Sequence, residues 1–139
     1  MDCLFCKIAS GEIPSLKIEE DGKHLAFLDI HPCSKGHTVV IPKKHSAAFA
    51  EMSERESAEL FAFVNGVSKQ IYKNLNADGL SIGTNVYEAA GQTVMHTHIH
   101  IIPRYNGDGG GSMHSIVSSC SAEEKDMKYL AQIQNQIRK

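Results

Sequence analysis

The amino-acid sequence predicts an α+β fold in a single domain, residues 1–139, built on an antiparallel sheet of about five strands. Short apolar runs separated by turn-forming residues occur in both halves of the chain, which is typical of antiparallel strands. Between them, one long stretch repeats its apolar residues at helical spacing. Since 139 residues can bury one core of ordinary size, we expect this helix to pack on the sheet.

The N-terminal half predicts a short helix and three strands. The helix is expected from Asp2 to Ser10, because Gly11 follows it as glycine commonly follows a last helical turn. The strands are expected at Lys17–Glu19, Leu25–Asp29 and Thr38–Pro42. Asp21-Gly22 and the segment Pro32–Gly36 separate these strands, and such turns favour antiparallel connections.

The C-terminal half predicts a long helix, two more strands and a final helix. Ser53 with Glu56 has the spacing of a capping box, and an apolar stripe then continues to Leu75. Residues 76–79 break this helix. The remaining elements are expected as strands at Leu80–Val86 and Thr97–Arg104, a mobile glycine-rich loop over residues 106–112, and a helix from Ser121 to Lys139.

Composition limits the class of function. A net charge of −2 argues against a protein that follows nucleic-acid phosphates. The segment Met1–Glu12 is too poor in apolar residues for a signal peptide, and no stretch reaches the roughly 18 apolar residues of a membrane span. Four cysteines without an export signal favour reduced thiols or metal ligands over disulfides. We therefore expect a cytoplasmic protein that binds neither membrane nor nucleic acid.

The strongest chemical signal is a run of three alternating histidines, His96, His98 and His100. On a strand they would share one face at intervals of about 6.6 Å, whereas on a helix the middle one would point away. Neighbouring β-branched residues and Pro103 favour the strand. Imidazoles can act as nucleophile, proton carrier or ligand near neutral pH. The alternative is a solvated strand face without function, against which the polar loop Gly91–Thr93 argues.

The segment His96–Ile102 resembles the His-φ-His-φ-His-φ-φ signature of the histidine triad (HIT) family, in which φ is apolar. Other segments that resemble the family follow in family order: Asp2–Ile8, Gly11–Pro14, Ala26–Ile30, Lys35–His37 and Val40–His45. The resemblance is to the Hint-like, bacterial Hit branch, and it covers about residues 2–105. It implies a HIT fold with its core in this range, followed by a C-terminal loop and helix in residues 106–139.

The resemblance implies a hydrolase or nucleotidyl transferase that attacks the α-phosphate of a purine nucleotide. His98 would be the nucleophile, with Nδ1 held by a backbone carbonyl and Nε2 free to form a nucleotidyl-histidine. His100 and Thr93 would contact the α-phosphate or the leaving group, and would stabilise charge or help to deliver a proton. The implied substrates are nucleoside phosphoramidates, aminoacyl-adenylates or dinucleoside polyphosphates, such as derivatives of AMP.

The resemblance also implies which residues bind the nucleotide. Asn85 and the backbone of Gly91 and Gln92 would hold phosphate oxygens, and Asp29 would accept hydrogen bonds from the ribose hydroxyls. The apolar wall against the base would comprise Phe5, Ile8, Phe27 and Ile30, with Leu4. Packing in the core is an equal alternative for Leu4 and Ile8. His37 matches a family histidine near the site, to which we assign no role here.

A structural zinc site is a separate expectation. Cys3 and Cys6 form a CxxC pair, which also occurs in redox motifs, but no βαβ context accompanies it. The resemblance to zinc-containing members of the branch implies that His45 and His96 complete a Cys₂His₂ site, which leaves no open position for catalysis. The alternative is two free thiols near the sheet. Residues expected to be incidental or on the surface are Cys33, Cys120, His24, His31 and His114.

Two other functions stay open. One is a catalytic zinc hydrolase with His96, His98 and His100 as ligands, although three ligands from one face of one strand are geometrically awkward. The other is a non-catalytic nucleotide-binding regulatory or scaffold protein. The resemblance further implies a homodimer to which the helix of residues 53–75 contributes, although its apolar stripe also suits packing within one subunit. Most members of the branch carry a tryptophan near the C-terminus, but this chain has none. The sequence therefore does not predict which residues form the leaving-group pocket.

Overall fold

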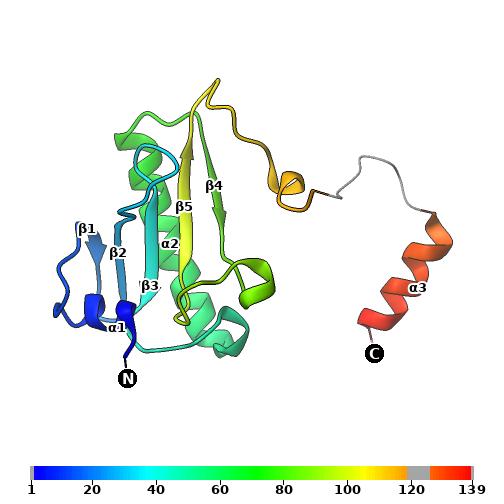
Figure 1. The fold of residues 1–139 in the computed structure, drawn as a ribbon, viewed down its shortest axis with the longest axis horizontal. Helices are drawn as coiled ribbons and strands as arrows, with labels where there is room; N and C mark the ends of the chain where they lie inside the picture. The colour runs from blue at the N-terminus through cyan, green and yellow to red at the C-terminus, as the bar shows by residue number, and fades with distance from the viewer. Residues whose placement is uncertain (1, 119–125, 139) are drawn as a thin grey trace. The chain divides into compact units, whose positions relative to one another are not determined.

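A computed structural model of the protein describes residues 2–118 and 126–138 (Figure 1). The chain divides into two compact units, Met1–Asp108 and Gly109–Lys139. The first contains α1 (Leu4–Ala9), β1 (Lys17–Glu20), β2 (His24–Leu28), β3 (Thr38–Pro42), η1 (Phe49–Glu51), α2 (Glu54–Asn74), β4 (Gly79–Gly83), η2 (Glu88–Ala90) and β5 (Ile99–Arg104). The second contains η3 (Met113–Ser115) and α3 (Met127–Ile137). The single domain over residues 1–139 stays a prediction.

The five strands form one antiparallel sheet in the order β1-β2-β3-β5-β4. The predicted α+β class with a five-stranded antiparallel sheet is therefore confirmed. Strand β5 lies inside the sheet, where Val39 of β3 pairs with His100. This pairing brings the histidine run beside the segment that ends at His37, which immediately precedes β3.

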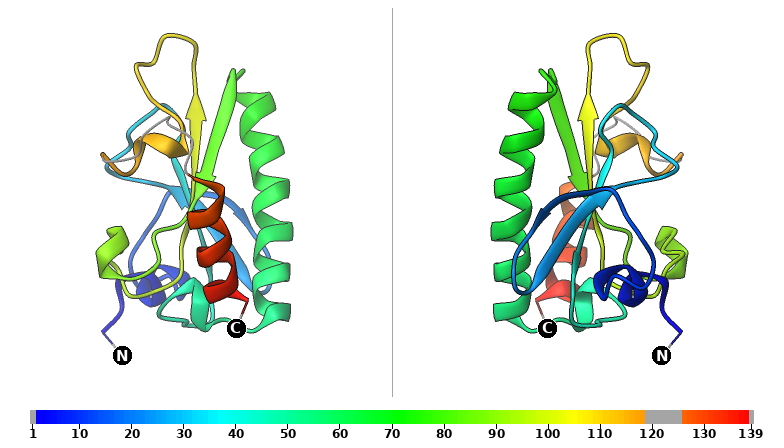
Figure 2. Two further views of the ribbon diagram at one scale, coloured as in Figure 1. Left: turned by 90° about the vertical axis from the view of Figure 1, so that its right-hand side faces the viewer. Right: turned by 90° about the vertical axis from the view of Figure 1, so that its left-hand side faces the viewer.

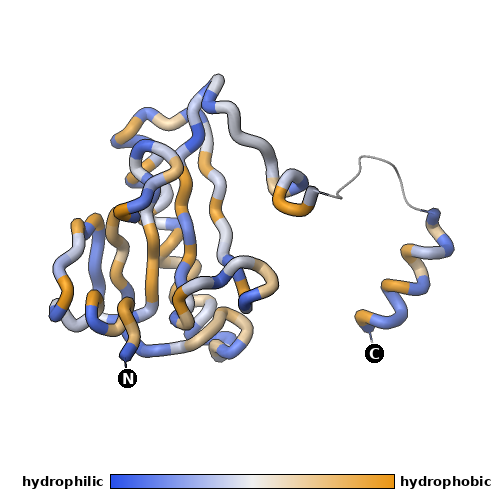
Figure 3. Tube along the Cα trace, in the orientation of Figure 1, coloured by the Kyte–Doolittle hydropathy of each residue, from blue (hydrophilic) through white to orange (hydrophobic). Residues whose placement is uncertain are grey.

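Both faces of the sheet are covered, because alternate strand residues point to opposite sides. Helix α2 lies along one face (Figure 2), where Leu60 and Val64 pack on Val40 and Ile99. On the other face, Phe5 and Ile8 of the short helix α1 belong to a second apolar cluster, formed with Leu25, Phe27, Val39 and Ile41. Strand β3 is accordingly apolar along most of its length in Figure 3.

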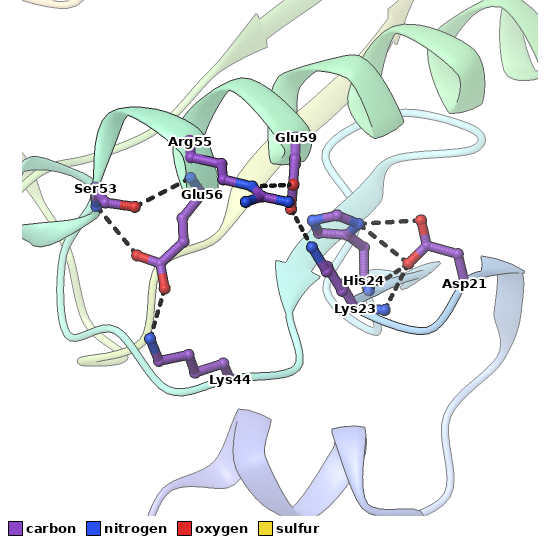
Figure 4. Close-up of polar contacts among 8 residues, drawn as sticks. All are labelled: Asp21, Lys23, His24, Lys44, Ser53, Arg55, Glu56 and Glu59. Atoms are coloured by element: carbon purple, nitrogen blue, oxygen red, sulfur yellow. Dashed lines mark hydrogen bonds and ion pairs between the residues drawn. The ribbon is translucent and has the colours of Figure 1, made fainter.

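Helix α2 begins with the predicted capping box, shown in Figure 4. The Ser53 hydroxyl accepts a hydrogen bond from the Glu56 N–H at 3.2 Å, and the Glu56 carboxylate accepts one from the Ser53 N–H at 3.1 Å. Lys44 pairs with the same carboxylate at 2.6 Å. The helix ends at Asn74, and Asn76 then takes a positive φ of 49°, which turns the chain towards β4.

The predicted strand over Thr97–Arg104 was wrong at its start, because β5 begins at Ile99. The backbone before it is held by loops instead of by a neighbouring strand. The Thr97 N–H donates to the Ser46 carbonyl at 2.7 Å, and the His98 carbonyl accepts from the Thr84 hydroxyl at 2.7 Å. Strand β4 likewise ends at Gly83, before the predicted Val86, so Thr84 is free to make this contact.

The helix predicted over Asp2–Ser10 is shorter in the structure, because Cys3 caps it instead of belonging to it. The Cys3 sulfur accepts a hydrogen bond from the Cys6 N–H at 3.4 Å. The connection between the predicted strands Leu80–Val86 and Thr97–Arg104 contains the short 3-10 helix η2.

The C-terminal unit contains the amphipathic helix α3, whose N-cap Asp126 accepts from the Lys128 N–H at 3.2 Å. The predicted start of this helix, Ser121–Glu124, lies outside the described residues. Within the described ranges, no helix combines the length and the apolar character that crossing a bilayer requires.

Candidate functional site

A cavity of about 510 Å³ opens on the α1 side of the sheet. Most residues predicted to bind the nucleotide line it: Phe5, Ile8, Phe27, Asp29, Ile30, Asn85, Gly91, Thr93, His98 and His100. Several further residues that line the cavity were not predicted, and they come chiefly from the segment Ile13–Leu16 after α1. This segment carries no spacing signal, and only the folded connection from α1 to β1 brings it to the cavity.

One wall of the cavity is apolar. The rings of Phe5 and Phe27 meet edge to face with their centroids 5.8 Å apart. Ile8 both lines the cavity and belongs to the core, so its two alternative interpretations hold together. Leu4 and Ile30 stand at the cavity with 47% and 80% of their surface exposed, which leaves them free to contact a ligand. Such a wall suits the flat face of a nucleotide base.

Asp29 places a carboxylate beside this wall. One of its oxygens, Oδ1, accepts a hydrogen bond from the His31 N–H at 2.8 Å, which fixes the side chain in a local turn. The other oxygen, Oδ2, lies 3.6 Å from His37 Nε2. A fixed carboxylate at the edge of an apolar wall can accept hydrogen bonds from vicinal hydroxyls.

The loop between β4 and β5 contains the two backbone amides that were predicted to hold phosphate oxygens. The Gly91 N–H donates to the Glu88 carbonyl at 2.9 Å, and the Gln92 N–H donates to the Tyr87 carbonyl at 3.2 Å. Both amides therefore hydrogen-bond within the loop itself, and their contact with phosphate oxygens stays a prediction. The polar side chains that line the cavity here belong to Asn85 and Thr93.

The side chain of Gln92 has a structural part that was not predicted, beside the part predicted for its backbone. Its side chain is buried, accepts from the Tyr87 N–H at 2.8 Å, and donates to the Ala47 and Val94 carbonyls at 2.6 and 3.0 Å. Tyr87 has a φ of 67°, a strained value for a residue other than glycine. Gln92 thus holds a strained loop in place behind Thr93, a role that no sequence pattern indicated.

His98 has the geometry expected of a nucleophile. Its Nδ1 lies 2.7 Å from the His96 carbonyl oxygen, so the ring proton sits on Nδ1 and Nε2 carries the free lone pair. The hydrogen bond predicted at Nδ1 is therefore present. The ring of Phe5 meets the His98 ring edge to face at 5.1 Å and restricts its orientation. Only 6% of the residue is exposed, which limits competing contact with water.

His100 and His37 form a second pair of imidazoles. His37 Nε2 lies 2.9 Å from His100 Nδ1, and the rings of His98 and His100 are 5.1 Å apart. Burial, together with repulsion from His98 and His37, lowers the pKa of His100 to about 4, although Asp29 opposes the shift. Burial also lowers the pKa of His37, again against Asp29. Both rings are therefore neutral at neutral pH.

The four predicted zinc ligands converge on one point beneath α1. The ligand atoms of Cys3, Cys6, His45 and His96 all lie within 4.8 Å of one another. His96 Nδ1 lies 3.4 Å from the Cys3 sulfur, 3.5 Å from the Cys6 sulfur and 3.3 Å from His45 Nδ1.

This arrangement fits a tetrahedral ion. Zinc bonds of about 2.3 Å to sulfur and about 2.0 Å to nitrogen set neighbouring ligand atoms roughly 3.3–3.8 Å apart. The His96 Nε2 lies 2.8 Å from the Pro42 carbonyl oxygen, so Nε2 holds the proton and Nδ1 keeps its lone pair for a metal. Burial and the neighbouring Cys3 raise the pKa of Cys6, an effect that a bound cation would reverse. The residues present therefore fit the metal.

Among the described residues, His96, His98 and His100 do not form a common cluster of metal-ligand atoms. The free nitrogen of His96, Nδ1, faces the sulfur atoms of Cys3 and Cys6. The Nδ1 of His98 instead contacts the His96 carbonyl oxygen, so its free nitrogen is Nε2. This geometry argues against a catalytic zinc bound by all three histidines. His24, expected at the surface, is buried and bonded to Asp21 instead.

Comparison with known proteins agrees with this geometry. The model of the HIT domain matches residues 10–107. An uncharacterised HIT-like protein of Methanocaldococcus jannaschii is 52% identical over 109 residues, 77% of this chain and 82% of that protein. The adenosine 5'-monophosphoramidase of Schizosaccharomyces pombe is 42% identical over 110 residues, 79% of this chain and 80% of that enzyme.

Solved structures that resemble this chain also include HIT family members. The crystal structure of a HIT family member from Bacillus subtilis is 40% identical, with a TM-score of 0.88 over 99% of this chain and 96% of that one. The family model, the relatives and the fold all point to one group, as the triad pattern predicted. The chain belongs to the HIT domain family.

Proposed function

We propose that this protein is a hydrolase or nucleotidyl transferase that attacks the α-phosphorus of a purine nucleotide through His98. The observation that carries the proposal is the 2.7 Å contact between His98 Nδ1 and the His96 carbonyl, because it leaves Nε2 unprotonated at the cavity. The relative from S. pombe, an adenosine 5'-monophosphoramidase, supports AMP phosphoramidates as the first substrates to test.

In the proposed reaction, Nε2 of His98 forms a bond to phosphorus as the bond to the leaving group breaks. The leaving group takes the electron pair of that bond and picks up a proton from solvent. The His96 carbonyl then stabilises the positive charge on the substituted imidazole through the Nδ1 proton. In the second step water attacks phosphorus as the bond between phosphorus and Nε2 breaks, and the proton lost by the water passes to solvent. This frees His98 and yields the nucleoside monophosphate. Another acceptor in place of water would make the protein a transferase.

The cavity supports a nucleotide in one orientation. The apolar wall of Phe5 and Phe27 suits the base, and the Asp29 carboxylate suits the ribose hydroxyls. Asn85 and Thr93 then lie on the same cavity as His98 and can donate hydrogen bonds to phosphate oxygens. Neutral donors of this kind explain how a chain with a net charge of −2 could bind an anion.

We also propose that Cys3, Cys6, His45 and His96 hold a structural zinc ion. The supporting observations are the tetrahedral spacing of their ligand atoms and the carbonyl that holds His96. Zinc bound there would tie α1 to the segment before β5 and take no part in the reaction. A homodimer is a further proposal, supported by Phe61 and Tyr72 of α2, which leave 40% and 48% of their surface exposed. Sedimentation of the full chain would test it.

The experiment for the main proposal compares AMP phosphoramidate turnover by the wild type and by His98→Ala. Rapid acid quench with labelled substrate should trap nucleotide on the wild type only. Equal rates for the two proteins would overturn the catalytic assignment. Binding of AMP without turnover by the wild type would favour the non-catalytic regulatory or scaffold protein instead.

A further inference from the structure

We propose that Cys3 and Cys6 form a redox-sensitive modification site, at which hydrogen peroxide closes a disulfide, zinc is released, and the cavity binds its nucleotide more weakly. The inference rests on the proposed zinc site for the metal and on the proposed function for the nucleotide. The bond between the two sulfur atoms, however, can be measured without any turnover.

The two sulfur atoms share the first turn of α1. Cys3 caps the helix, and its sulfur accepts a hydrogen bond from the Cys6 N–H at 3.4 Å. The two sulfurs lie within 4.8 Å of each other, as members of the same set of converging ligand atoms. CxxC pairs with this spacing close to a disulfide in redox proteins. Among the described residues, Cys3 and Cys6 are therefore the two cysteines placed to bond to each other, since Cys33 lies outside the cluster.

The two thiols differ in access. Cys3 is buried, with 8% of its surface exposed, whereas Cys6 is half-buried. The Cys6 sulfur lies 3.4 Å from Nδ1 of His45, and His45 also lines a second cavity of about 520 Å³. That cavity shares no lining residue with the nucleotide cavity. A small oxidant can therefore reach Cys6 by a path that the nucleotide does not fill.

Hydrogen peroxide is the oxidant in the proposed reaction. The Cys6 thiolate attacks one peroxide oxygen, the O–O bond breaks, and the departing hydroxide takes a proton from solvent to become water. The Cys3 thiolate then attacks the sulfur of the resulting sulfenic acid. The S–O bond breaks as the S–S bond forms, and a second hydroxide leaves and is protonated to water. The two thiolates together lose two electrons, and the peroxide gains them.

A disulfide at these positions cannot hold the metal. Zinc binds cysteine as the thiolate, and oxidation removes both negative charges from the set of ligands. The imidazoles of His45 and His96 would remain, two ligands where a structural zinc site needs four. Oxidation would therefore release zinc and remove the tie between α1 and the segments that carry these two histidines.

Helix α1 connects this loss to the nucleotide cavity. Phe5 stands between the two cysteines in sequence, lines the cavity, and contacts the rings of Phe27 and His98 at 5.8 and 5.1 Å. Leu4 and Ile8 of the same helix line the cavity too. The apolar cluster beneath α2 contains no residue of α1, so the sheet and α2 should stay packed when α1 is released. The expected result is a folded protein with a displaced base wall and weaker nucleotide binding.

Titration of the zinc-loaded full chain with hydrogen peroxide tests the modification. One zinc should be released to a chelating dye for each disulfide formed, with a mass loss of about 2 Da for the two hydrogens removed. Peptide mapping should join Cys3 to Cys6, and dithiothreitol with added zinc should reverse both changes. Thiols that stay reduced in excess peroxide would overturn the inference, as would release of zinc with only sulfinic acid at these cysteines.

Two cysteine variants serve as matched controls for this titration. The double variant Cys33→Ser/Cys120→Ser keeps the CxxC pair and should release zinc as the wild type does. Cys6→Ser leaves Cys3 without its partner and should form no disulfide within α1. A double variant that no longer responds to peroxide would overturn the inference, because the reactive thiols would then lie elsewhere.

Calorimetric titration with AMP measures the effect on the cavity. Kd for AMP should rise about tenfold or more on oxidation and return on reduction with zinc, because an aromatic wall of the site loses its position. His45→Asn keeps both thiols but removes a proposed ligand, so its reduced form should already bind AMP as weakly as the oxidised wild type. An unchanged Kd in the oxidised wild type or in this variant would overturn the inference. The wild-type measurement decides the question if His45→Asn fails to fold.

The same measurements separate this inference from the two proposals on which it rests. A protein that binds no zinc before oxidation would refute the zinc site and this inference together. Zinc that stays bound after the disulfide has formed would refute the inference alone. Absence of AMP phosphoramidate turnover, combined with loss of zinc and of AMP affinity on oxidation, would refute the proposed function and leave the redox-sensitive site intact.

Discussion

His96 and His98 stand two residues apart, and the structure holds their rings by opposite nitrogens. Both are buried, with 0% and 6% exposed, and the ring of Phe5 contacts both edge to face, at 6.0 and 5.1 Å. Each has one ring nitrogen at a backbone carbonyl, but not the same nitrogen. His96 uses Nε2, at 2.8 Å from Pro42, whereas His98 uses Nδ1, at 2.7 Å from His96 itself.

The difference shows that the position of the carbonyl partner decides which ring nitrogen of each histidine keeps its lone pair. A neutral ring holds its proton where it can donate, and the lone pair stays on the other nitrogen. For His96 that lone pair faces the sulfur atoms of Cys3 and Cys6. For His98 it is left for the cavity. One chain segment thus carries a proposed zinc ligand and the proposed nucleophile side by side.

The largest expected effect separates the two histidines by activity. His98→Gln should lower kcat by about 10⁴-fold or more, because it removes the proposed nucleophile. Its melting temperature and metal content should stay near those of the wild type. Steady-state kinetics, thermal melting and elemental analysis measure the three quantities. Residual activity within tenfold of the wild type would contradict the division of tasks.

The converse change should act on stability. Cys6→Ser removes a proposed zinc ligand, so the protein should lose its metal and at least about 3 kcal/mol of unfolding free energy. The kcat of the molecules that remain folded should fall far less than in His98→Gln. Elemental analysis and urea unfolding provide the readouts, with Cys33→Ser as the control because Cys33 is exposed and lies outside the ligand cluster. Zinc retained by Cys6→Ser would contradict the site.

Sequence patterns were sufficient to predict much of this fold. The capping box at Ser53 fixed the start of α2, since both partners lie within one turn. The strand at Thr38–Pro42 was predicted with its observed bounds, because turns flank an unbroken apolar run. The start of β5 could not be predicted. Thr97 has β-forming character, but its N–H bonds to Ser46, a partner that only the folded loops bring near.

In the site, too, residue identities could be predicted from the sequence, whereas contacts between distant segments could not. The resemblance to the HIT family pointed to Cys3, Cys6, His45 and His96, and the structure brings them together. The part played by Gln92 was missed, because its partners at Ala47 and Tyr87 depend on how two loops meet. The contact between His37 and His100 also depends on the register of β3 with β5, which no sequence spacing encodes.

His100 extends the comparison to the third triad histidine through its dependence on pH. Its pKa is about 4 in the folded protein against an ordinary value of 6.5, mainly because it is buried. As pH falls below 6.5 the unfolded chain takes up a proton at this ring first, so the folded state loses stability down to about pH 4. The loss attributable to His100 should be roughly 2–3 kcal/mol between pH 7 and 4.5.

Urea unfolding of the wild type and His100→Gln at these two pH values measures this contribution, because groups that do not contact His100 bind protons alike in both proteins. The variant should lose less stability on acidification than the wild type. An equal loss in both proteins would mean that His100 titrates normally and that its pocket does not disfavour the charged ring.

The smallest expected effect concerns the backbone of the segment that holds His96 and His98. The Thr84 hydroxyl donates to the His98 carbonyl at 2.7 Å, and this contact replaces the ladder that β5 does not extend to His98. Thr84→Val keeps the shape of the side chain and removes only the donor, which should cost about 1 kcal/mol of stability. The rate should fall about three- to tenfold, because the nucleophile loses part of its positioning. Metal content should not change, since His96 is held separately by Pro42. Thr84→Ser, which restores the hydroxyl, should recover both stability and rate. Loss of metal from Thr84→Val would instead mean that the backbone around His98 and the ligand cluster form one coupled unit. The separation of the two histidines would then fail.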